Sequence, residues 1–269
     1  VLPLEQIPYG GGQPAGYAAS PSEVVNYVEN HDNQTLYDAN TLNLPIGTSP
    51  ADRARVQVLG LAINAFSQGV AYFHAGSEIL RSKSLDRNSF NSGDWFNRLD
   101  WSGQDNYFGS GLPPRRDNGA SWPLMRPRLA DPALRPAPAQ ISFTLGAFRD
   151  LLRIRASSTL FRLRSAAEVE ARLRLLNTGP AQVPTVLVGH LDGEGYAGAG
   201  FRELLYFINV DPHAREIVLP GEGGKDWRLH PVHQDPAAAD PRPAASARYD
   251  ATNGRFTIPA RTAMVWVVD

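Results

Sequence analysis

Apolar and polar residues follow two different patterns along the chain, and the change comes near residue 160. Before it, short β-branched and aromatic runs alternate with stretches of helical periodicity. After it, short alternating segments are separated by Gly, Pro and Asp. We therefore expect an α/β part at residues 1–160 and an antiparallel all-β part at residues 161–269.

Two short apolar runs, residues 24–28 and 70–74, predict buried strands. Between them, residues 49–68 predict a helix whose Ser-Pro-Ala-Asp start offers a cap, a proline in the first turn and a capping box. Gly69 is expected to end this helix. Strand, helix and strand at this spacing predict a βαβ unit and hence a parallel sheet.

The remaining segments of the first half are polar or rich in Gly and Pro. Residues 1–21 are expected to be a loop or tail, and a polar loop is expected up to Gly47. Residues 75–138 predict a long irregular segment whose Trp and Tyr residues favour an ordered, functional loop. A second helix is expected at residues 139–157, with an apolar stripe of Ile141, Leu145, Phe148 and Leu152.

The second half predicts a series of short strands joined by turns, with a Pro- and Ala-rich loop at residues 237–245. The expected strands cover residues 169–175, 185–191, 204–210, 216–219, 227–230, 255–258 and 262–268. Many short strands with turn residues between them are typical of an antiparallel sheet module.

Composition narrows the function classes. The 269 residues carry a formal net charge of -1, which favours neither nucleic-acid binding nor a polybasic membrane face. No apolar run is long enough to cross a membrane. Cysteine is absent, which excludes disulfides, thiolate metal sites and a cysteine nucleophile but leaves the compartment open. Because residue 1 is Val rather than Met, we expect a piece of a longer protein.

His31 and Asp32 stand in a polar stretch directly after the first predicted strand. They allow two interpretations: a strand end with a structural His–Asp hydrogen bond, or a catalytic pair. The second gains weight because the carboxyl ends of parallel barrel strands are where such folds place their chemistry.

Asp94, Trp95 and Arg98 form a second candidate site. Asp94 and Arg98 are four residues apart and could form a surface ion pair, which contributes little. Alternatively, the carboxylate and guanidinium bind sugar hydroxyls while Trp95 stacks on the apolar face of a sugar.

Other motifs have weaker support. Residues 193–198 match G-x-G-x-x-G, but the predicted strand after them favours a hairpin loop over a nucleotide site. His230 and His233 resemble a metal pair, but the intervening proline disfavours the helix that would align them. No G-x-S-x-G, P-loop or H-E-x-x-H motif is present, so serine hydrolases, NTPases and zinc proteases lack support.

Longer motifs resemble type I pullulanases and limit dextrinases of the α-amylase superfamily of glycoside hydrolases. The stretch ending in His31-Asp32 resembles the superfamily's strand-seven motif, and Gly69–Glu78 its strand-eight motif. The more specific matches are residues 26–36, 80–97, 111–114, 151–163 and 177–180. Among them, Arg-Ser-Lys-Ser-Leu-Asp-Arg at residues 81–87 is the most distinctive.

The resemblance implies a (β/α)8 TIM barrel followed by a β-sandwich, and endo-hydrolysis of α-1,6 branch points. It implies that Asp32 is the third catalytic carboxylate, which stabilises the transition state, and that His31 binds the same glucose. Asn33 would line the next subsite. Asp94 and Arg98 match the superfamily pair that binds the neighbouring glucose. Ser77 departs from the pattern, since the family usually carries Asp there.

The sequence shows no match to the two carboxylates that break the glycosidic bond in this family. A retaining glycosidase needs a nucleophile and an acid about 5 Å apart, and in this family they come from barrel strands four and five. We therefore expect a C-terminal portion with barrel strands seven and eight, inactive by itself. Strands of an incomplete barrel have open edges, so this portion is expected to self-associate or rearrange.

The resemblance also implies the ligands. The expected partner is an α-glucan such as pullulan, limit dextrin, amylopectin or glycogen, with no nucleic acid and no membrane. The chemistry requires no cofactor, while a structural calcium in a longer protein stays open. The alternatives are a non-catalytic α-glucan-binding or scaffold protein with this fold and, from residues 193–198, a nucleotide-binding module.

Overall fold

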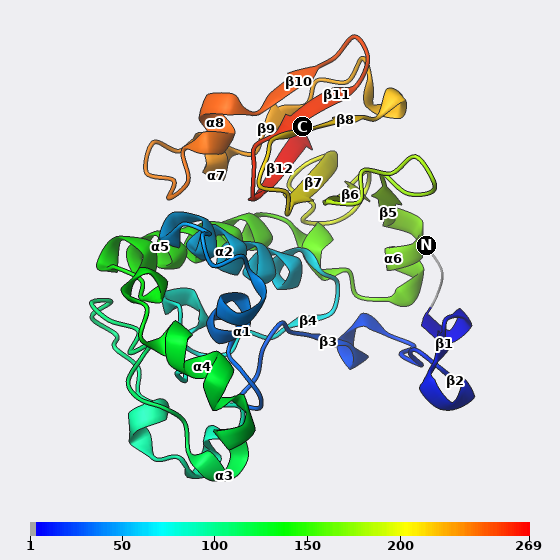
Figure 1. Ribbon diagram of the computed structural model, residues 1–269. Helices are drawn as coiled ribbons and strands as arrows, with labels where there is room; N and C mark the ends of the chain where they lie inside the picture. The colour runs from blue at the N-terminus through cyan, green and yellow to red at the C-terminus, as the bar shows by residue number, and fades with distance from the viewer. Residues whose placement is uncertain (1–3) are drawn as a thin grey trace.

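The computed structural model describes residues 4–269 and shows a layered arrangement (Figure 1). Helices α2 (Pro50–Phe66) and α5 (Pro138–Ser157) pack side by side across the centre. The five-stranded and three-stranded antiparallel sheets lie on one side of them, and a short parallel pair with the long segment after it lies on the other. Within residues 4–269, no helix has the length and apolar character that a membrane span requires.

The shorter helices surround this centre. They are α1 (Leu36–Asn43), α3 (Arg115–Asn118), α4 (Trp122–Leu129), α6 (Ala166–Arg172), α7 (Pro231–Gln234) and α8 (Arg242–Ser246). Single 3-10 turns cover Leu4–Gln6, Gly10–Gly12, Pro21–Glu23, Ser77–Ile79, Ser89–Asn91, Asp94–Phe96, Gly119–Ser121, Pro132–Leu134, Thr159–Arg162 and Pro220–Glu222.

The strands form two pairs and two larger sheets. β1 (Pro8–Tyr9) and β2 (Gln13–Pro14) are antiparallel, and β3 (Val25–Asn26) and β4 (Val70–Ala71) are parallel. The five-stranded sheet has the order β5-β6-β7-β12-β9, with the bounds Leu173–Leu176, Val186–Asp192, Glu203–Asn209, Thr262–Val268 and Arg228–Leu229. The three-stranded sheet has the order β10-β11-β8, with the bounds Arg248–Asp250, Arg255–Ile258 and Arg215–Val218.

The five-stranded sheet is buried on both faces at its centre. In β7, Leu204, Tyr206 and Ile208 face the helices, whereas Leu205 and Phe207 face the three-stranded sheet. This is why β7 has an almost continuous apolar sequence, although side chains alternate along a strand. The helices and the central sheet therefore share one apolar core, and the division at residue 160 stays a prediction.

Strand and helix predictions are confirmed where a cap or a long apolar segment marked them. The Ser49 hydroxyl accepts a hydrogen bond from the Asp52 amide at the start of α2. The second predicted helix matches α5, and the 255–258 and 262–268 strands match β11 and β12. The turn at residues 193–198 joins antiparallel β6 and β7, as the hairpin interpretation predicted.

The two predicted buried strands of the first half are wrong in length and burial. Only the two-residue strands β3 and β4 form, and Val25 and Val70 are 53% and 45% exposed. Their apolar side chains have few neighbours in residues 4–269 because this parallel sheet consists of just these two strands.

Several local predictions need correction because a cap or a proline starts a helix there. Residues 29–47 are not all loop, since Thr35 caps α1. Residues 169–175 are not one strand, since Ser165 and Glu168 form a capping box that starts α6. Residues 75–138 contain α3 and α4, and residues 237–245 run into α8.

Other corrections concern the ends and faces of elements. Helix α2 ends at Phe66 with Ser67 as its C-cap, before Gly69. In α5 the buried stripe is Ile141, Thr144, Ala147, Leu151 and Ile154, whereas Leu152 is exposed. Residues 1–21 include the β1–β2 hairpin, apart from residues 1–3, which lie outside the described part.

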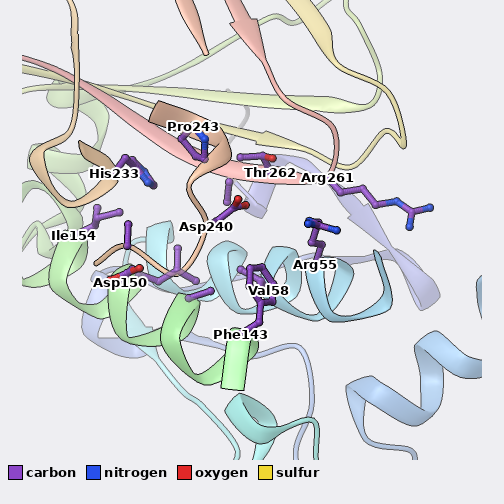
Figure 2. A pocket seen from close by; sticks show the side chains of 14 residues that line it. Arg55, Val58, Phe143, Asp150, Ile154, His233, Asp240, Pro243, Arg261 and Thr262 are labelled. Atoms are coloured by element: carbon purple, nitrogen blue, oxygen red, sulfur yellow. The ribbon is translucent and has the colours of Figure 1, made fainter. Parts of the chain in front are cut away.

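A small cavity lies where α2 and α5 meet the sheet layer (Figure 2). Its volume is about 40 Å³, and its lining includes Arg55, Phe143 and Asp240. Sites for small organic ligands are typically about 300–1,000 Å³, so this cavity is too small for a sugar. It marks the seam between the two layers.

His230 and His233 are buried next to this seam and are hydrogen-bonded as neutral rings. His230 accepts from the Val232 amide at 3.2 Å, and His233 accepts from the Val265 amide at 3.2 Å. His230 caps helix α7, which begins at Pro231 and contains His233, and this corrects the loop prediction. Burial lowers the pKa of His230 to about 4 and that of His233 to about 3.

These histidines predict a loss of stability in acid. In the unfolded chain they bind protons once the pH falls below their ordinary pKa of 6.5, whereas in the folded chain they stay neutral until about 4 and about 3. The free energy of unfolding therefore falls as the pH drops through this range. In urea titrations, His233→Gln should reduce the decline between about pH 7 and about pH 4.5 by roughly 2 kcal/mol.

His213→Gln is the matched control, because the His213 side chain is 79% exposed and its charged contact is with Asp211, at 3.1 Å. It should change the decline by less than about 1 kcal/mol, because exposed ion pairs contribute little. An equal decline in the wild type and in His233→Gln would contradict the assignment.

Candidate active site

The loop after β3 presents His31, Asp32 and Asn33 to solvent. The side chains of His31 and Asp32 are 82% and 73% exposed, and His31 Nε2 lies 3.7 Å from the Asp32 carboxylate. Asn33 has a left-handed backbone with φ of 57°, and the Asn30 side chain accepts a hydrogen bond from the Asp32 amide at 2.7 Å. The three residues form one exposed polar turn.

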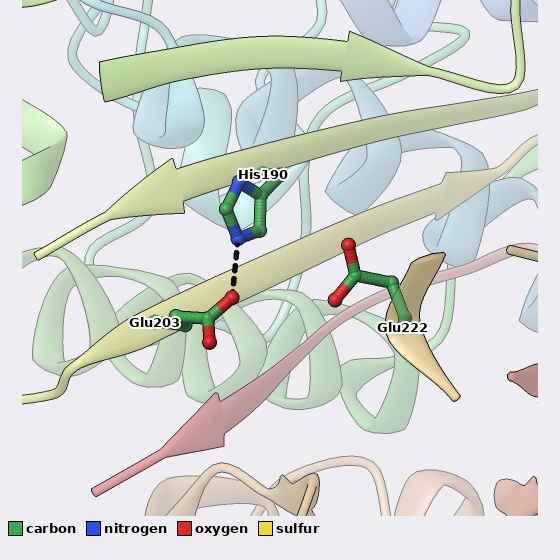
Figure 3. A group of neighbouring side chains, drawn as sticks. All are labelled: His190, Glu203 and Glu222. Atoms are coloured by element: carbon green, nitrogen blue, oxygen red, sulfur yellow. Dashed lines mark hydrogen bonds and ion pairs between the residues drawn. The ribbon is translucent and has the colours of Figure 1, made fainter. Parts of the chain in front are cut away.

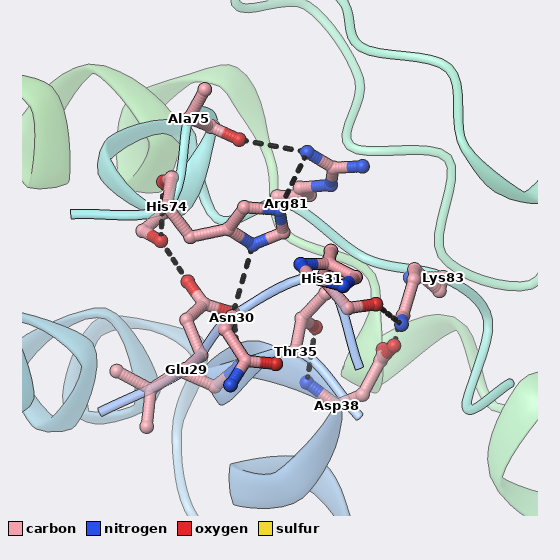
Figure 4. A network of polar contacts seen from close by, with 12 residues as sticks. Glu29, Asn30, His31, Thr35, Asp38, His74, Ala75, Arg81 and Lys83 are labelled. Atoms are coloured by element: carbon pink, nitrogen blue, oxygen red, sulfur yellow. Dashed lines mark hydrogen bonds and ion pairs between the residues drawn. The ribbon is translucent and has the colours of Figure 1, made fainter. Parts of the chain in front are cut away.

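Glu29 anchors the start of this turn from below (Figure 4). It is only 6% exposed, and one carboxylate oxygen accepts the Leu36 amide at 2.6 Å, at the start of α1. The other oxygen contacts the hydroxyl of Ser77, which follows β4 and also lies 2.7 Å from the His74 carbonyl. Glu29 therefore connects the two parallel strands and the first helix.

His74 and Arg81 extend the network. His74 is 8% exposed, and its Nε2 lies 3.1 Å from an Arg81 nitrogen. Because a guanidinium can only donate, His74 Nε2 is the acceptor and the ring proton is on Nδ1. That nitrogen lies 3.9 Å from Glu29 Oε2. The ring therefore faces the buried carboxylate without a hydrogen bond to it.

Asp38 holds the far end of the turn. It is fully buried in α1 and accepts from the Ser82 hydroxyl at 2.6 Å and from the Lys83 amide at 2.8 Å. Burial raises the pKa of Asp38 to about 6, although these hydrogen bonds oppose the rise. The Lys83 ammonium in turn donates to the His31 carbonyl at 3.0 Å.

The second candidate group forms a different contact from the one predicted. The Arg98 guanidinium lies 4.3 Å from the ring centre of Trp95 and 3.7 Å from that of Tyr107. Asp94 is exposed, and its carbonyl accepts the Arg98 amide at 2.9 Å. Trp95 is 56% exposed, and its indole donates to the Ser110 carbonyl at 2.9 Å. Arg98 therefore stacks on aromatic rings rather than pairing with Asp94.

The two groups remain separate in the described residues. Among the described residues, 4–269, no hydrogen bond or ion pair joins the His31 turn to the Asp94–Arg98 segment. A larger groove of about 820 Å³ lies between the N-terminal segment and the α6–β5 region, and its lining contains none of the predicted site residues. Within the described part of the chain, the residues expected to bind sugar therefore lie in the His31 turn and in the segment bearing Trp95.

Among residues 4–269, one cluster has the ligand types for a metal: His190, Glu203 and Glu222 (Figure 3). His190 lies 2.8 Å from Glu203, and the Lys225 ammonium pairs with Glu203 and lies 2.8 Å from Glu222. Burial tends to raise the pKa of Glu203, but Lys225 and His190 hold it below its usual range. The Lys225 ammonium already pairs with both carboxylates, so the cluster is an ion-pair centre of the sheet.

Comparison with known families shows which protein family the chain belongs to. A family model described as alpha-1,6-glucosidases, pullulanase-type, C-terminal, matches residues 103–269. The chain belongs to this pullulanase-type family. The resemblance drawn from the motifs is thereby confirmed.

Curated pullulanases extend the similarity over almost the whole chain. Pullulanase 1, chloroplastic, of Arabidopsis thaliana is 44% identical over 262 residues, covering 94% of this chain and 27% of the relative. The pullulanase of Klebsiella pneumoniae is 37% identical over 259 residues, covering 95% and 23%. The chain thus spans about a quarter of the length of these relatives.

Solved pullulanase structures share the fold. Apo pullulanase from Klebsiella pneumoniae superposes with a TM-score of 0.89 at 35% identity, over 98% of this chain and 28% of that one. A maltotriose complex of PulA from the same organism also has a TM-score of 0.89 at 35% identity, again over 98% and 28%. The layered arrangement described above is therefore that of the matching region in pullulanases.

Sequence reasoning missed the buried residues under the turn. Glu29, Asp38 and Lys83 each look like ordinary surface residues because they are charged. A signal was present for Asp38, since Thr35 precedes it by three residues as an N-cap would. Nothing in the sequence alone indicated that Lys83 reaches back 52 positions to His31.

Glu29 predicts a stability defect that a surface carboxylate would not cause. Glu29→Ala leaves the Leu36 amide without its acceptor and removes the buried carboxylate that Ser77 contacts, so the free energy of unfolding should fall by about 2–3 kcal/mol in urea titrations. Glu23→Ala is the matched control, because the exposed Glu23 accepts only the Ala19 amide and should lose less than about 1 kcal/mol. Equal losses for both variants would refute the anchoring role of Glu29.

Proposed function

We propose that the chain is the C-terminal part of a debranching glycoside hydrolase that cleaves α-1,6 links in pullulan, limit dextrin and amylopectin. The observation that supports this most is the exposed His31–Asp32 turn, hydrogen-bonded to the buried Lys83, in a chain of the pullulanase-type family. The parallel β3–β4 pair would be strands seven and eight of a (β/α)8 barrel, and the antiparallel sheets would form the β-sandwich that follows.

Asp32 would stabilise the transition state in this proposal. In such reactions the sugar ring becomes positively charged and flattened as the bond breaks. A carboxylate held beside the ring binds its hydroxyls and favours that distorted form. His31 would donate to the same glucose, and Asn33 would line the next subsite.

Trp95, Asp94 and Arg98 would bind the neighbouring glucose. Trp95 offers an exposed aromatic face, and Asp94 an exposed carboxylate. The contact of Arg98 with Trp95 and Tyr107 gives this group a fixed guanidinium beside the indole. No cofactor is needed in this scheme, and a structural calcium in a longer protein remains an expectation.

The nucleophile and the general acid would lie outside the 269 residues. The purified chain should therefore release no reducing ends from pullulan above the buffer blank, although it should bind maltotriose. Trp95→Ala should weaken that binding about tenfold, measured by calorimetry. Trp101→Ala is the matched control, because Trp101 is also exposed, at 65%, but belongs to neither candidate group.

Hydrolysis of pullulan by this chain would refute the assignment of the missing carboxylates. Absence of maltotriose binding, or equal effects of the two Trp variants, would refute the sugar site. The alternative is a non-catalytic α-glucan-binding or scaffold protein with the same fold. Reading the gene upstream of the Val1 codon separates the two, because an enzyme requires the remaining barrel strands there.

The exposed apolar face around β3 and β4 supports a second proposal, that the isolated chain self-associates. Val25 and Tyr27 are each 53% exposed, and Val70 and Tyr72 are 45% and 39% exposed. Open edges of this kind pair readily with other chains. In light scattering, the mass should rise with protein concentration, and Val70→Lys should suppress the rise.

Val218→Lys on β8 is the control for self-association, since Val218 is 50% exposed on the distant three-stranded sheet. It should leave the concentration dependence unchanged. A monomer mass at all concentrations would contradict this proposal without affecting the assignment of the sugar site.

A further inference from the structure

Lys83 is an unusual residue in the described part of the chain because its charged side chain is almost completely enclosed. It is 1% exposed and ranks among the largest fully buried side chains. An ammonium taken out of water loses its hydration, which is costly unless other groups replace it. Burial lowers the pKa of Lys83, while the nearby carboxylates of Asp38 and Asp86 act in the opposite direction.

The ammonium is directed at the backbone of the candidate active site. The ammonium donates a hydrogen bond to the main-chain carbonyl of His31, at 3.0 Å (Figure 4). A bond to that carbonyl fixes the peptide that joins His31 to Asp32. The direction in which both side chains leave the turn depends on the orientation of this peptide.

The backbone around Lys83 is held in place by its conformation and by hydrogen bonds. The two residues after it, Ser84 and Leu85, are buried and have left-handed φ values of 49° and 68°. Non-glycine residues rarely adopt this conformation, and they keep it only where the surroundings impose it. Here Asp38 holds the Lys83 amide, and the Ser84 hydroxyl donates to the Tyr107 carbonyl at 3.2 Å.

We propose that Lys83 is a positioning residue for the His31–Asp32 pair: its buried ammonium orients the His31 carbonyl and thereby sets where the two side chains point. The importance of this for catalysis rests on the proposed function, whereas the effect on the turn does not. Lys83 touches no reacting atom in this scheme and acts only through the backbone of the turn.

The first test measures backbone mobility of the turn by ¹⁵N relaxation in the purified chain. In the wild type, residues 31–33 should have order parameters near 0.85, and in Lys83→Met these should fall below about 0.6. Lys225→Met is the matched control, since it removes a partly buried ammonium from the distant sheet and should leave residues 31–33 unchanged. Lys83→Leu, which also has no hydrogen-bond donor, serves if the Met variant does not fold.

Chemical rescue separates the ammonium from the packing of its stem. The chain has no cysteine, so Lys83→Cys can be aminoethylated at that single position in the unfolded state and refolded. The modified side chain again carries an ammonium and should restore the rigid turn, whereas the unmodified variant should not. Rigid residues 31–33 in folded Lys83→Met or Lys83→Leu, or no difference on aminoethylation, would overturn the proposal.

Maltotriose titration connects the turn with sugar binding. Lys83→Met should weaken binding about tenfold, and aminoethylation of Lys83→Cys should recover it. If the wild type binds no maltotriose, the proposed sugar site fails, while the relaxation data still decide the role of Lys83. If the wild type binds and mobile variants bind equally well, the turn does not serve the sugar site.

Discussion

The hydrogen bonds buried beneath residues 30–35 determine the geometry of the candidate site. Glu29, Asp38 and Lys83 each bring a charge out of water, and each is compensated by partners from a different segment. Buried polar groups tolerate little displacement because a lost partner is not replaced by water. The exposed turn is therefore supported at both ends and in its middle, which leaves its side chains free to meet a ligand.

This arrangement explains why the sequence predicted part of the site and not the rest. His31, Asp32 and Asn33 are consecutive, so any turn that carries one of them carries all three. The supports come from residues 29 to 83, and their proximity depends on the pairing of β3 with β4 and on the start of α1. The contact of Arg98 with Trp95 and Tyr107 was also not predictable, because it competes with the Asp94 ion pair that the spacing suggested.

The fold was predictable where local and tertiary preferences agree. Ser49 and the Pro that follows it start α2, as the sequence indicated, and the turn at residues 193–198 leads into a strand. The prediction failed at Val169 and Ala171, because over so few residues alternation with charged neighbours fits a helix as well as a strand. It also failed for Val25, whose apolar character predicts burial. Val25 is exposed because few side chains of the described residues pack against it.

The shared core between the helices and the five-stranded sheet has a consequence for how such sequences can be recombined. Phe66 of α2 stacks on Phe161 and packs against Tyr206 of β7. One aromatic cluster therefore contains residues from both sides of residue 160, near which the pattern of apolar and polar residues changes. A chimaera joined at residue 160 would combine halves of this cluster from two different proteins. A junction placed before α2 would transfer the helices together with the sheet they cover and keep the cluster intact.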